Sequence, residues 1–125
     1  MCARVHPCVT VVKMTADALL ALIEQGAAPA ILDVRTEREF ALGHVPGARH
    51  VPFQQVLGRI HDLPAGPDDP IVVYCGHGPR AHLAGWALRA AGFRHVQYLR
   101  GHWAGWLRAR IRVESGMGSS YTRPL

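Results

Sequence analysis

Apolar residues alternate along the chain between short clustered runs and patterns with helical spacing. Short, largely apolar runs bounded by glycine, proline or polar residues are typical of strands buried in a sheet. Such runs lie at 9–12, 30–34, 71–74 and 96–99, and a further short strand is expected at 49–51. The pattern therefore predicts four or five strands separated by other elements.

Helical patterns occupy the segments between these runs. After Thr15, a candidate N-cap, apolar residues follow at positions i, i+3, i+4 and i+7, and Gly26 closes the pattern. Thr36 and Glu39 have the spacing of a capping box, which predicts a short helix through Phe40. We also expect a turn at 43–48, a helix at 54–60 and a surface loop at 63–70, which contains three prolines.

Two further helices are predicted in the second half of the chain. One begins after Arg80, carries an apolar stripe and ends at Gly92; the stripe consists of Ala84, Ala87, Leu88 and Ala91. The other carries Trp103, Trp106 and Leu107, which we assign to the core because they share helical spacing. From about Glu114 onward no periodicity is visible, which predicts a loose tail.

Strands that alternate with helices indicate an α/β fold, with a small parallel sheet and helices on both faces. We expect a single domain over residues 1–113 and a flexible C-terminal tail over 114–125. In parallel sheets of this kind, ligands bind beyond the carboxyl ends of the strands. The sequence therefore directs the search for a site to the residues that follow each strand.

Composition narrows the functional classes. The 125 residues are 49% hydrophobic and 18% charged, as in ordinary globular proteins, and the net charge is +5. The positive charge is almost all arginine, Lys13 being the only lysine, and it is scattered without interleaved aromatic residues. This distribution argues against a nucleic-acid partner and fits a field that attracts small anions.

The cysteine count and the N-terminal residues suggest a compartment. Three cysteines leave at least one thiol free within a single chain, which suits a reducing environment. Residues 1–13 contain no apolar segment typical of a signal peptide, and no run is long enough to span a membrane. We therefore expect a cytoplasmic protein without a membrane partner.

Cys75 is the strongest candidate for chemistry. It ends the apolar run at 71–74 and opens the loop 75–80, directly before a predicted helix. Unpaired N–H groups and the helix dipole favour an anion at such a place, and a thiolate is an anion. Cysteines in this position next to an arginine ionise more readily than ordinary cysteines. Cys75 is therefore predicted to be a nucleophile.

The loop after Cys75 suits the binding of an anion. Gly76 and Gly78 allow backbone conformations that other residues avoid, so that successive N–H groups can converge on the sulfur. Arg80 has two open roles, capping the loop or meeting an anionic donor. His77 could orient a leaving group or could simply be an exposed loop residue.

Several other polar residues have candidate roles. Asp33 ends a buried strand and needs a partner, for which we expect Arg35 or an arginine of the loop, in a supporting role. His44 is expected to fix its turn by hydrogen bonding. Cys2, His6 and Cys8 lack a fourth ligand and a known spacing, so no metal site is predicted there. Nucleophilic chemistry at Cys75 requires no cofactor, and none is predicted.

The chain resembles the rhodanese family of sulfurtransferases. Four stretches carry the likeness in the family's order: 32–35 with Glu39 and Phe40, 43–48, 73–78 with Arg80 and Ala81, and 99–101 with Trp106. The likeness departs from the family at two places. A pair of glycines usual after the last strand is Gly101-His102 here, which we expect to affect only a turn. Pro79 stiffens the loop and could alter which donor fits.

The resemblance implies that Cys75 carries a transferred sulfur as a persulfide, inside a substrate-binding loop of Gly76, His77, Gly78, Pro79 and Arg80. It also implies thiosulfate or a similar small anionic donor, and cyanide, a thiol or possibly a protein as acceptor. Two alternatives stay open. One is a phosphatase, although cysteine phosphatases have five residues between the cysteine and the arginine, whereas this chain has only residues 76–79. A non-catalytic docking or persulfide-carrier module has the same fold.

Overall fold

The computed structural model describes residues 12–109, 113–115 and 119–121. Its centre is a five-stranded, wholly parallel sheet in the order β1-β5-β4-β2-β3. The strands are β1 Val12–Met14, β2 Ala30–Asp33, β3 Arg49–His50, β4 Ile71–Tyr74 and β5 Val96–Leu99. The predicted α/β fold with a small parallel sheet is confirmed.

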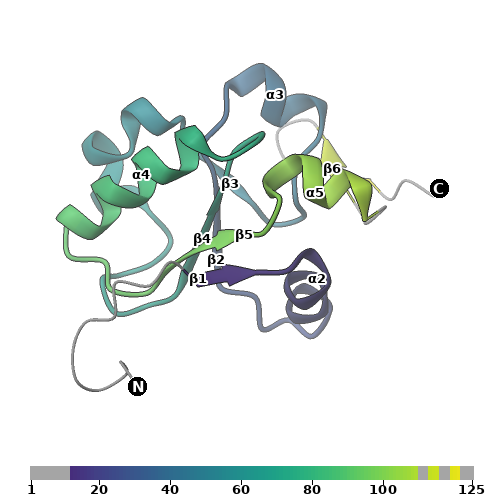
Figure 1. The fold of residues 1–125 in the computed structure, drawn as a ribbon, viewed down its shortest axis with the longest axis horizontal. Coiled ribbons are helices and arrows are strands. Elements are labelled where there is room, and N and C mark those ends of the chain that lie inside the picture. The colour runs from purple at the N-terminus through teal and green to yellow at the C-terminus, as the bar shows by residue number, and fades with distance from the viewer. Residues whose placement is uncertain (1–11, 110–112, 116–118, 122–125) are drawn as a thin grey trace.

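Helices cover both faces of this sheet (Figure 1). The α-helices are α2 Ala16–Glu24, α3 Glu37–Leu42, α4 Pro79–Ala90 and α5 His102–Arg108. Two 3₁₀ segments, η1 Phe53–Gln55 and η2 Leu57–Asp62, lie beside α4. Helix α4 and the 3₁₀ segments lie on one side of the sheet, and α2, α3 and α5 lie on the other.

Strand β4 shows how the sequence divides between the two layers. Its four residues are all fully buried, as expected for a central strand. Because successive side chains point to opposite faces, Ile71 and Val73 join the apolar cluster under α4, whereas Val72 and Tyr74 join the one under α2 and α5. Cys75 continues the alternation and belongs to the α4 side.

The predicted helix starts are confirmed at two places. The Thr15 hydroxyl accepts the Ala18 N–H at 3.1 Å, and α2 follows directly. Thr36 accepts the Glu39 N–H at 3.2 Å, while Glu39 accepts the Thr36 N–H at 2.9 Å, which completes the capping box of α3. Local sequence signals therefore set both of these boundaries.

Several details of the elements differ from the sequence prediction. The expected helix at 54–60 is instead the pair of 3₁₀ segments, with a non-helical backbone at Arg59; a short segment containing Gly58 gains little from a regular α-helix. The strand predicted at 9–12 is described only from Val12 and continues to Met14, and 9–11 lie outside the described residues. Ala91, expected in the buried stripe, is exposed because α4 ends at Ala90.

The segment after α5 contains ordered pairing where a loose tail was expected. Strand β6, Val113–Ser115, pairs antiparallel with β7, Ser119–Tyr121. Val113 is buried and packs in the cluster under α2 and α5. Part of the predicted 114–125 tail thus forms a two-stranded sheet, while the division of the chain at 113 stays a prediction.

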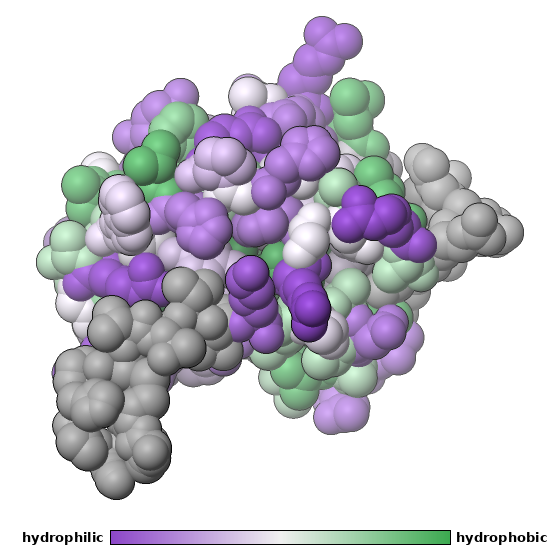
Figure 2. Space-filling view, viewed as in Figure 1, coloured by the Kyte–Doolittle hydropathy of each residue, from purple (hydrophilic) through white to green (hydrophobic). Residues whose placement is uncertain are grey.

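The side chains of the described surface are mostly hydrophilic on the face drawn in Figure 2, with hydrophobic residues in separate groups. The exposed large hydrophobic residues are Leu42, Leu57, Leu83, Trp86 and Leu107. Leu107 and the half-buried Trp103 thus depart from the core role expected for α5, whereas Trp106 is fully buried as predicted.

Gly85 sets how closely α4 approaches the sheet. A Cβ atom at this position would collide with the Tyr98 hydroxyl and would lie 2.8 Å from the ring carbon Cζ. Tyr98 is held in place because its hydroxyl accepts a hydrogen bond from Arg89 at 3.2 Å. Only a glycine therefore allows this helix to pack over β5.

We expect Gly85→Ala to lower the free energy of unfolding by about 1–3 kcal/mol, because overpacking outweighs the better helix propensity of alanine. Urea unfolding midpoints measure the effect. Gly58→Ala is the matched control, since its added Cβ would meet nothing within 4 Å. Equal stability of Gly85→Ala and the unchanged protein would show that the close contact is not limiting.

Candidate functional site

Cys75 follows β4 at the carboxyl edge of the sheet, and α4 begins only four residues later. Gly78 is the N-cap of α4 with φ +135°, and Pro79 is the first helical residue. The helix therefore begins within the predicted 75–80 loop, because proline is well suited to a first helical position. The irregular part of the loop is limited to 75–78, and Arg80 lies in the first turn of α4.

The sulfur of Cys75 receives a backbone hydrogen bond. The Gly78 N–H donates to Sγ at 3.0 Å. Two other backbone groups of the loop do not serve the sulfur: Pro79 has no N–H, and the Cys75 N–H donates to Nδ1 of His102 at 3.3 Å. Gly78 is therefore the loop donor that bonds the cysteine sulfur, and the convergence of further amides on the outer sulfur of a persulfide stays a prediction.

The first turn of α5 holds the backbone of the loop. The Cys75 carbonyl accepts the Trp103 N–H at 2.9 Å, and the Gly76 carbonyl accepts the Ala104 N–H at 3.3 Å. These N–H groups at a helix start would otherwise lack partners. Helix α5 therefore holds the loop that leads into α4, although the two helices lie on opposite faces of the sheet.

The Cys75 side chain has no exposed surface. Its relative exposure is 0%, and it belongs to the apolar cluster under α4. A nucleophile has to meet its substrate, so this burial is at odds with the role predicted for Cys75 unless the site opens. Access of any reagent to the sulfur requires a movement of the loop or of the side chains over it.

Arg80 lies over the loop and pairs with α3. Its Nη1 and Nη2 donate to the Glu39 carboxylate at 2.8 and 3.3 Å. Nη2 lies 3.2 Å from the place where a Cβ of Gly76 would stand, so the guanidinium packs against the bare glycine. The side-chain hydrogen bonds of Arg80 thus go to α3, and both roles open for it, capping the loop and meeting an anionic donor, stay predictions.

The same ion pair perturbs the titration of Glu39. The hydrogen bond from Arg80 is the largest cause that lowers the pKa of Glu39 from 4.5 to about 2, against the opposing effect of burial. For Arg80, the bond to Glu39 raises the pKa, and the nearby Cys75 is a further contributor. The guanidinium is therefore close enough to Cys75 to interact with it electrostatically.

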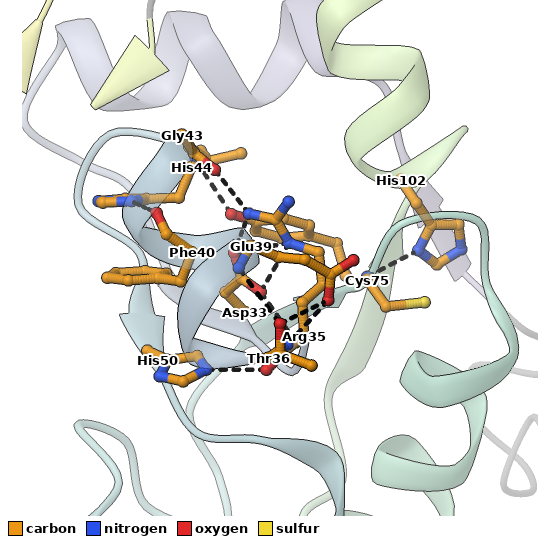
Figure 3. Close-up of polar contacts among 12 residues, drawn as sticks. Asp33, Arg35, Thr36, Glu39, Phe40, Gly43, His44, His50, Cys75 and His102 are labelled. Carbon is orange, nitrogen blue, oxygen red and sulfur yellow. Dashed lines mark hydrogen bonds and ion pairs between the residues drawn. The ribbon is translucent and has the colours of Figure 1, made fainter. Parts of the chain in front are cut away.

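Asp33 and Arg35 form the buried pair that the sequence predicted (Figure 3). Arg35 Nε donates to both carboxylate oxygens at 3.0 and 3.1 Å, and Nη2 donates to one of them at 2.7 Å. Nη2 also donates to the Gly43 carbonyl at 2.7 Å. The guanidinium lies 4.7 Å from the ring centre of Trp103 and 5.6 Å from that of Tyr74. Arg35 thus links β2, the end of α3 and α5.

Two histidines support the strand ends near this pair. His44 Nδ1 is 2.7 Å from the Phe40 carbonyl, and its ring stacks on Phe40 with centroids 3.6 Å apart. His50 Nε2 is 2.8 Å from the Arg35 carbonyl. His44 thus forms a hydrogen bond as expected, but the bond joins the start of the 43–48 turn to α3 and does not lie within the turn.

His102 is the residue of this site that the sequence prediction missed. Its ring is buried, with 8% exposure, and accepts the Cys75 N–H. Burial, with smaller contributions from His82, Lys13 and His77, lowers the pKa of His102 from 6.5 to about 4. The departure from a glycine pair at 101–102 was visible in the sequence, but it was expected to affect only a turn.

The remaining predicted positions are placed as follows. His77 is exposed at the loop, and its chemical role stays a prediction. Within the described part of the chain, no three acidic, histidine or cysteine side chains are arranged to hold a metal ion. Cys2, His6 and Cys8 lie outside that part.

A groove of about 360 Å³ lies beside the Arg35 cluster. Its walls come from α3, α5 and β6, and its lining consists of Arg35, Glu39, Leu42, Gly43, Trp103, Leu107 and Val113. Glu39 is shared between this groove and the ion pair over the Cys75 loop. The groove and the loop are therefore neighbours through one carboxylate.

The fold and this site define an α/β protein with a cysteine at the carboxyl edge of a parallel sheet. Residues 15–109 match the model of the rhodanese-like domain, and the chain belongs to this family. No helix in the described part of the chain has the length and apolar character needed to cross a membrane.

Relatives and solved structures agree with this assignment. Thiosulfate sulfurtransferase GlpE of Ectopseudomonas mendocina is 35% identical over 91 residues, covering 71% of this chain and 79% of that protein. Protein YqhL of Bacillus subtilis is 32% identical over 83 residues, and the match spans 64% of its length, slightly less than two thirds. The crystal structure of Alr3790 from Anabaena sp. superimposes with a TM-score of 0.75 at 30% identity, covering 83% of this chain and 93% of that one.

We expect Asp33→Asn to lower the free energy of unfolding by about 3–5 kcal/mol, because it leaves the buried Arg35 charge without compensation. Chemical denaturation measures this. Asp68→Asn removes the same charge from the exposed pair with Arg94, whose side chains are 71% and 67% exposed, and should change stability by at most about 1 kcal/mol. Similar losses in both variants would contradict the role given to Asp33.

The Glu39 carboxylate makes the stability of the protein depend on pH in the acid range. The folded protein holds Glu39 ionised down to about pH 2, whereas the unfolded chain protonates it near pH 4.5. The contribution of Glu39 is therefore complete above pH 4.5 and is lost as the pH falls through about 2.

Glu39→Gln keeps a side chain that can complete the capping box but removes the charge. We expect it to be less stable than the unchanged protein at pH 7, with the difference closing between pH 4.5 and 2. Urea midpoints across this range measure the difference. A gap that stays constant down to pH 2 would show that the ionised form of Glu39 contributes nothing.

Proposed function

We propose that this protein is a sulfurtransferase that moves a sulfane sulfur from thiosulfate or a similar small anionic donor, through a persulfide on Cys75, to a thiol or cyanide acceptor. The observation that carries the proposal is the sulfur of Cys75, which ends a central strand and accepts the Gly78 N–H at 3.0 Å at the start of α4. Membership of the rhodanese-like family supports the same chemistry.

The proposed cycle balances without an external oxidant or reductant. The Cys75 thiolate attacks the outer sulfur of thiosulfate, the S–S bond breaks, and sulfite leaves with the electron pair. The acceptor then attacks the outer sulfur of the persulfide, and Cys75 returns to the thiolate. Neither a metal nor an organic cofactor takes part in these steps.

The electrostatic surroundings suit an anionic nucleophile and an anionic donor. The start of α4 presents the positive end of its dipole at the loop, and the Gly78 N–H is already directed at the sulfur. Arg80 adds a full charge close to Cys75. The net charge of +5 would favour the approach of a sulfur-donor anion.

The buried sulfur of Cys75 has to become accessible before a donor can react with it. Arg80 and Glu39, which lie over Gly76, are partly exposed, with side-chain exposures of 29% and 38%. Solvent screens a partly exposed ion pair, so a second anion can compete with Glu39 for Arg80. A donor anion can replace Glu39 as the partner of Arg80 and so draw the guanidinium away from Gly76.

The phosphatase alternative receives less support from the loop. A phosphoryl group needs several backbone donors around its oxygens, but Pro79 has no N–H and the Cys75 N–H is bonded to His102. The carrier or docking alternative shares the fold, and it differs in having no turnover with small donors. The following experiment separates these possibilities.

Incubation with thiosulfate should add one sulfur to Cys75, seen by intact mass and peptide mapping, and cyanide should then release thiocyanate. Cys75→Ser and Cys75→Ala should each abolish both signals, and their unfolding midpoints show whether the variants are folded under the assay conditions. A phosphate ester serves as the parallel substrate. Absence of sulfur addition from thiosulfate and from mercaptopyruvate would favour the docking module, and hydrolysis of the ester would favour the phosphatase.

A further inference from the structure

His102 combines three unusual features. It is the one non-glycine residue in the described part of the chain with a positive φ, at +55°. It is buried, although histidine is a polar residue. Its ring also contacts the Cys75 loop, 27 residues earlier in the sequence. A left-handed backbone costs a non-glycine residue roughly 1–2 kcal/mol, so contacts of the side chain have to compensate for this strain.

The hydrogen bond to Cys75 defines the form of the ring. Because the Cys75 N–H donates at 3.3 Å, Nδ1 of His102 has to be the unprotonated acceptor, and the neutral ring carries its proton on Nε2. Burial favours this neutral form. The ring therefore satisfies an amide that would otherwise be buried at the end of β4 without a partner.

The other edge of the ring packs on Gly78. A Cβ atom on Gly78 would lie 3.4 Å from Nε2 and 3.7 Å from Cδ2 of His102. Gly78 is the residue whose N–H donates to the sulfur of Cys75. One imidazole ring thus contacts both ends of the four-residue turn that holds the nucleophile; Figure 3 shows it next to Cys75, on the side away from the Arg35 cluster.

We propose that His102 is a positioning residue for Cys75: its ring fixes the Cys75 amide and the Gly78 backbone so that the Gly78 N–H is directed at the sulfur. The proposal deepens the sulfurtransferase function and rests on it for its catalytic consequence. His102 does not touch the donor and acts only through the loop.

The surroundings of the ring favour a fixed orientation. His82 lies edge-on to His102 with centroids 6.1 Å apart and packs in turn on Tyr98 at 4.5 Å. The neighbouring Trp103 and Ala104 N–H groups hold the carbonyls of Cys75 and Gly76. The start of α5 thus contacts the loop through main chain and side chain together, and His102 supplies the contact that reaches the Gly78 end.

Two substitutions separate the acceptor from the bulk of the ring. His102→Gly relieves the strained backbone but removes the acceptor and the buried ring, so its unfolding midpoint is measured to confirm that it is folded under the assay conditions. His102→Asn also tolerates a left-handed backbone and places a short carbonyl acceptor near the position of Nδ1. His61→Asn, at an exposed position on η2, is the control for loss of a histidine.

The measurements follow the loop directly. Hydrogen exchange of the Cys75 amide, alkylation of Cys75 by iodoacetamide and its persulfide formation with thiosulfate are each compared among the variants, with peptide mapping to separate the other cysteines. In His102→Gly we expect exchange to be faster and persulfide formation slower by about threefold to tenfold, the range that one neutral hydrogen bond supports. His102→Asn should restore both to within about twofold, and His61→Asn should change neither.

Contradicting results are equally defined. The proposal is wrong if His102→Gly keeps the exchange and persulfide rates of the unchanged protein, or if His102→Asn is as impaired as His102→Gly. A protein that forms no persulfide at all contradicts the sulfurtransferase function alone. Amide exchange and alkylation then still decide whether His102 positions Cys75, because neither depends on a sulfur donor.

Discussion

The site depends most on the buried ion pair between the Arg35 guanidinium and the Asp33 carboxylate. The guanidinium binds the Asp33 carboxylate and the Gly43 carbonyl, and it lies under the ring of Trp103. The Trp103 N–H in turn holds the Cys75 carbonyl. An uncompensated charge at this depth would be very costly, so the pair forces β2, the end of α3 and α5 to keep one relative arrangement. The cysteine loop is built on that arrangement.

Helices α4 and α5 both contact the cysteine loop, but through different groups. Helix α4 provides the Gly78 N–H and a positive dipole end for the sulfur. Helix α5 uses its first N–H groups to bind the carbonyls of Cys75 and Gly76, so these groups are not free for an anion. Helix α4 and Arg80 therefore place positive charge near the sulfur, and α5 holds the backbone of the loop.

The fold was largely predictable because its signals are local. The buried runs defined the central strands, and Thr15 and Thr36 marked helix starts through hydrogen bonds three residues away. The segment 54–60 was predicted less well, since a short stretch with a central glycine fits a 3₁₀ and an α-helix almost equally. The pairing of β6 with β7 was not predicted because the sequence of these strands shows no strong hydrophobic periodicity.

The site was predictable where partners are near in sequence and less so where they are distant. Asp33 and Arg35 are two residues apart, and their pairing followed from the cost of a buried carboxylate. Glu39 was recognised only as a cap, because its bond to Arg80 spans 41 residues. His102 was recognised only as a departure from a glycine pair, since its contact with Cys75 exists only in the folded chain.

The complete burial of Cys75 has a consequence for how a sulfur-loaded form would look from outside. A second sulfur atom on this side chain needs space that a densely packed interior does not offer. Loading would therefore displace part of the 75–78 turn or of the side chains covering it. The surface near the loop would then differ between the persulfide form and the free-thiol form, and an acceptor would distinguish the two forms by shape.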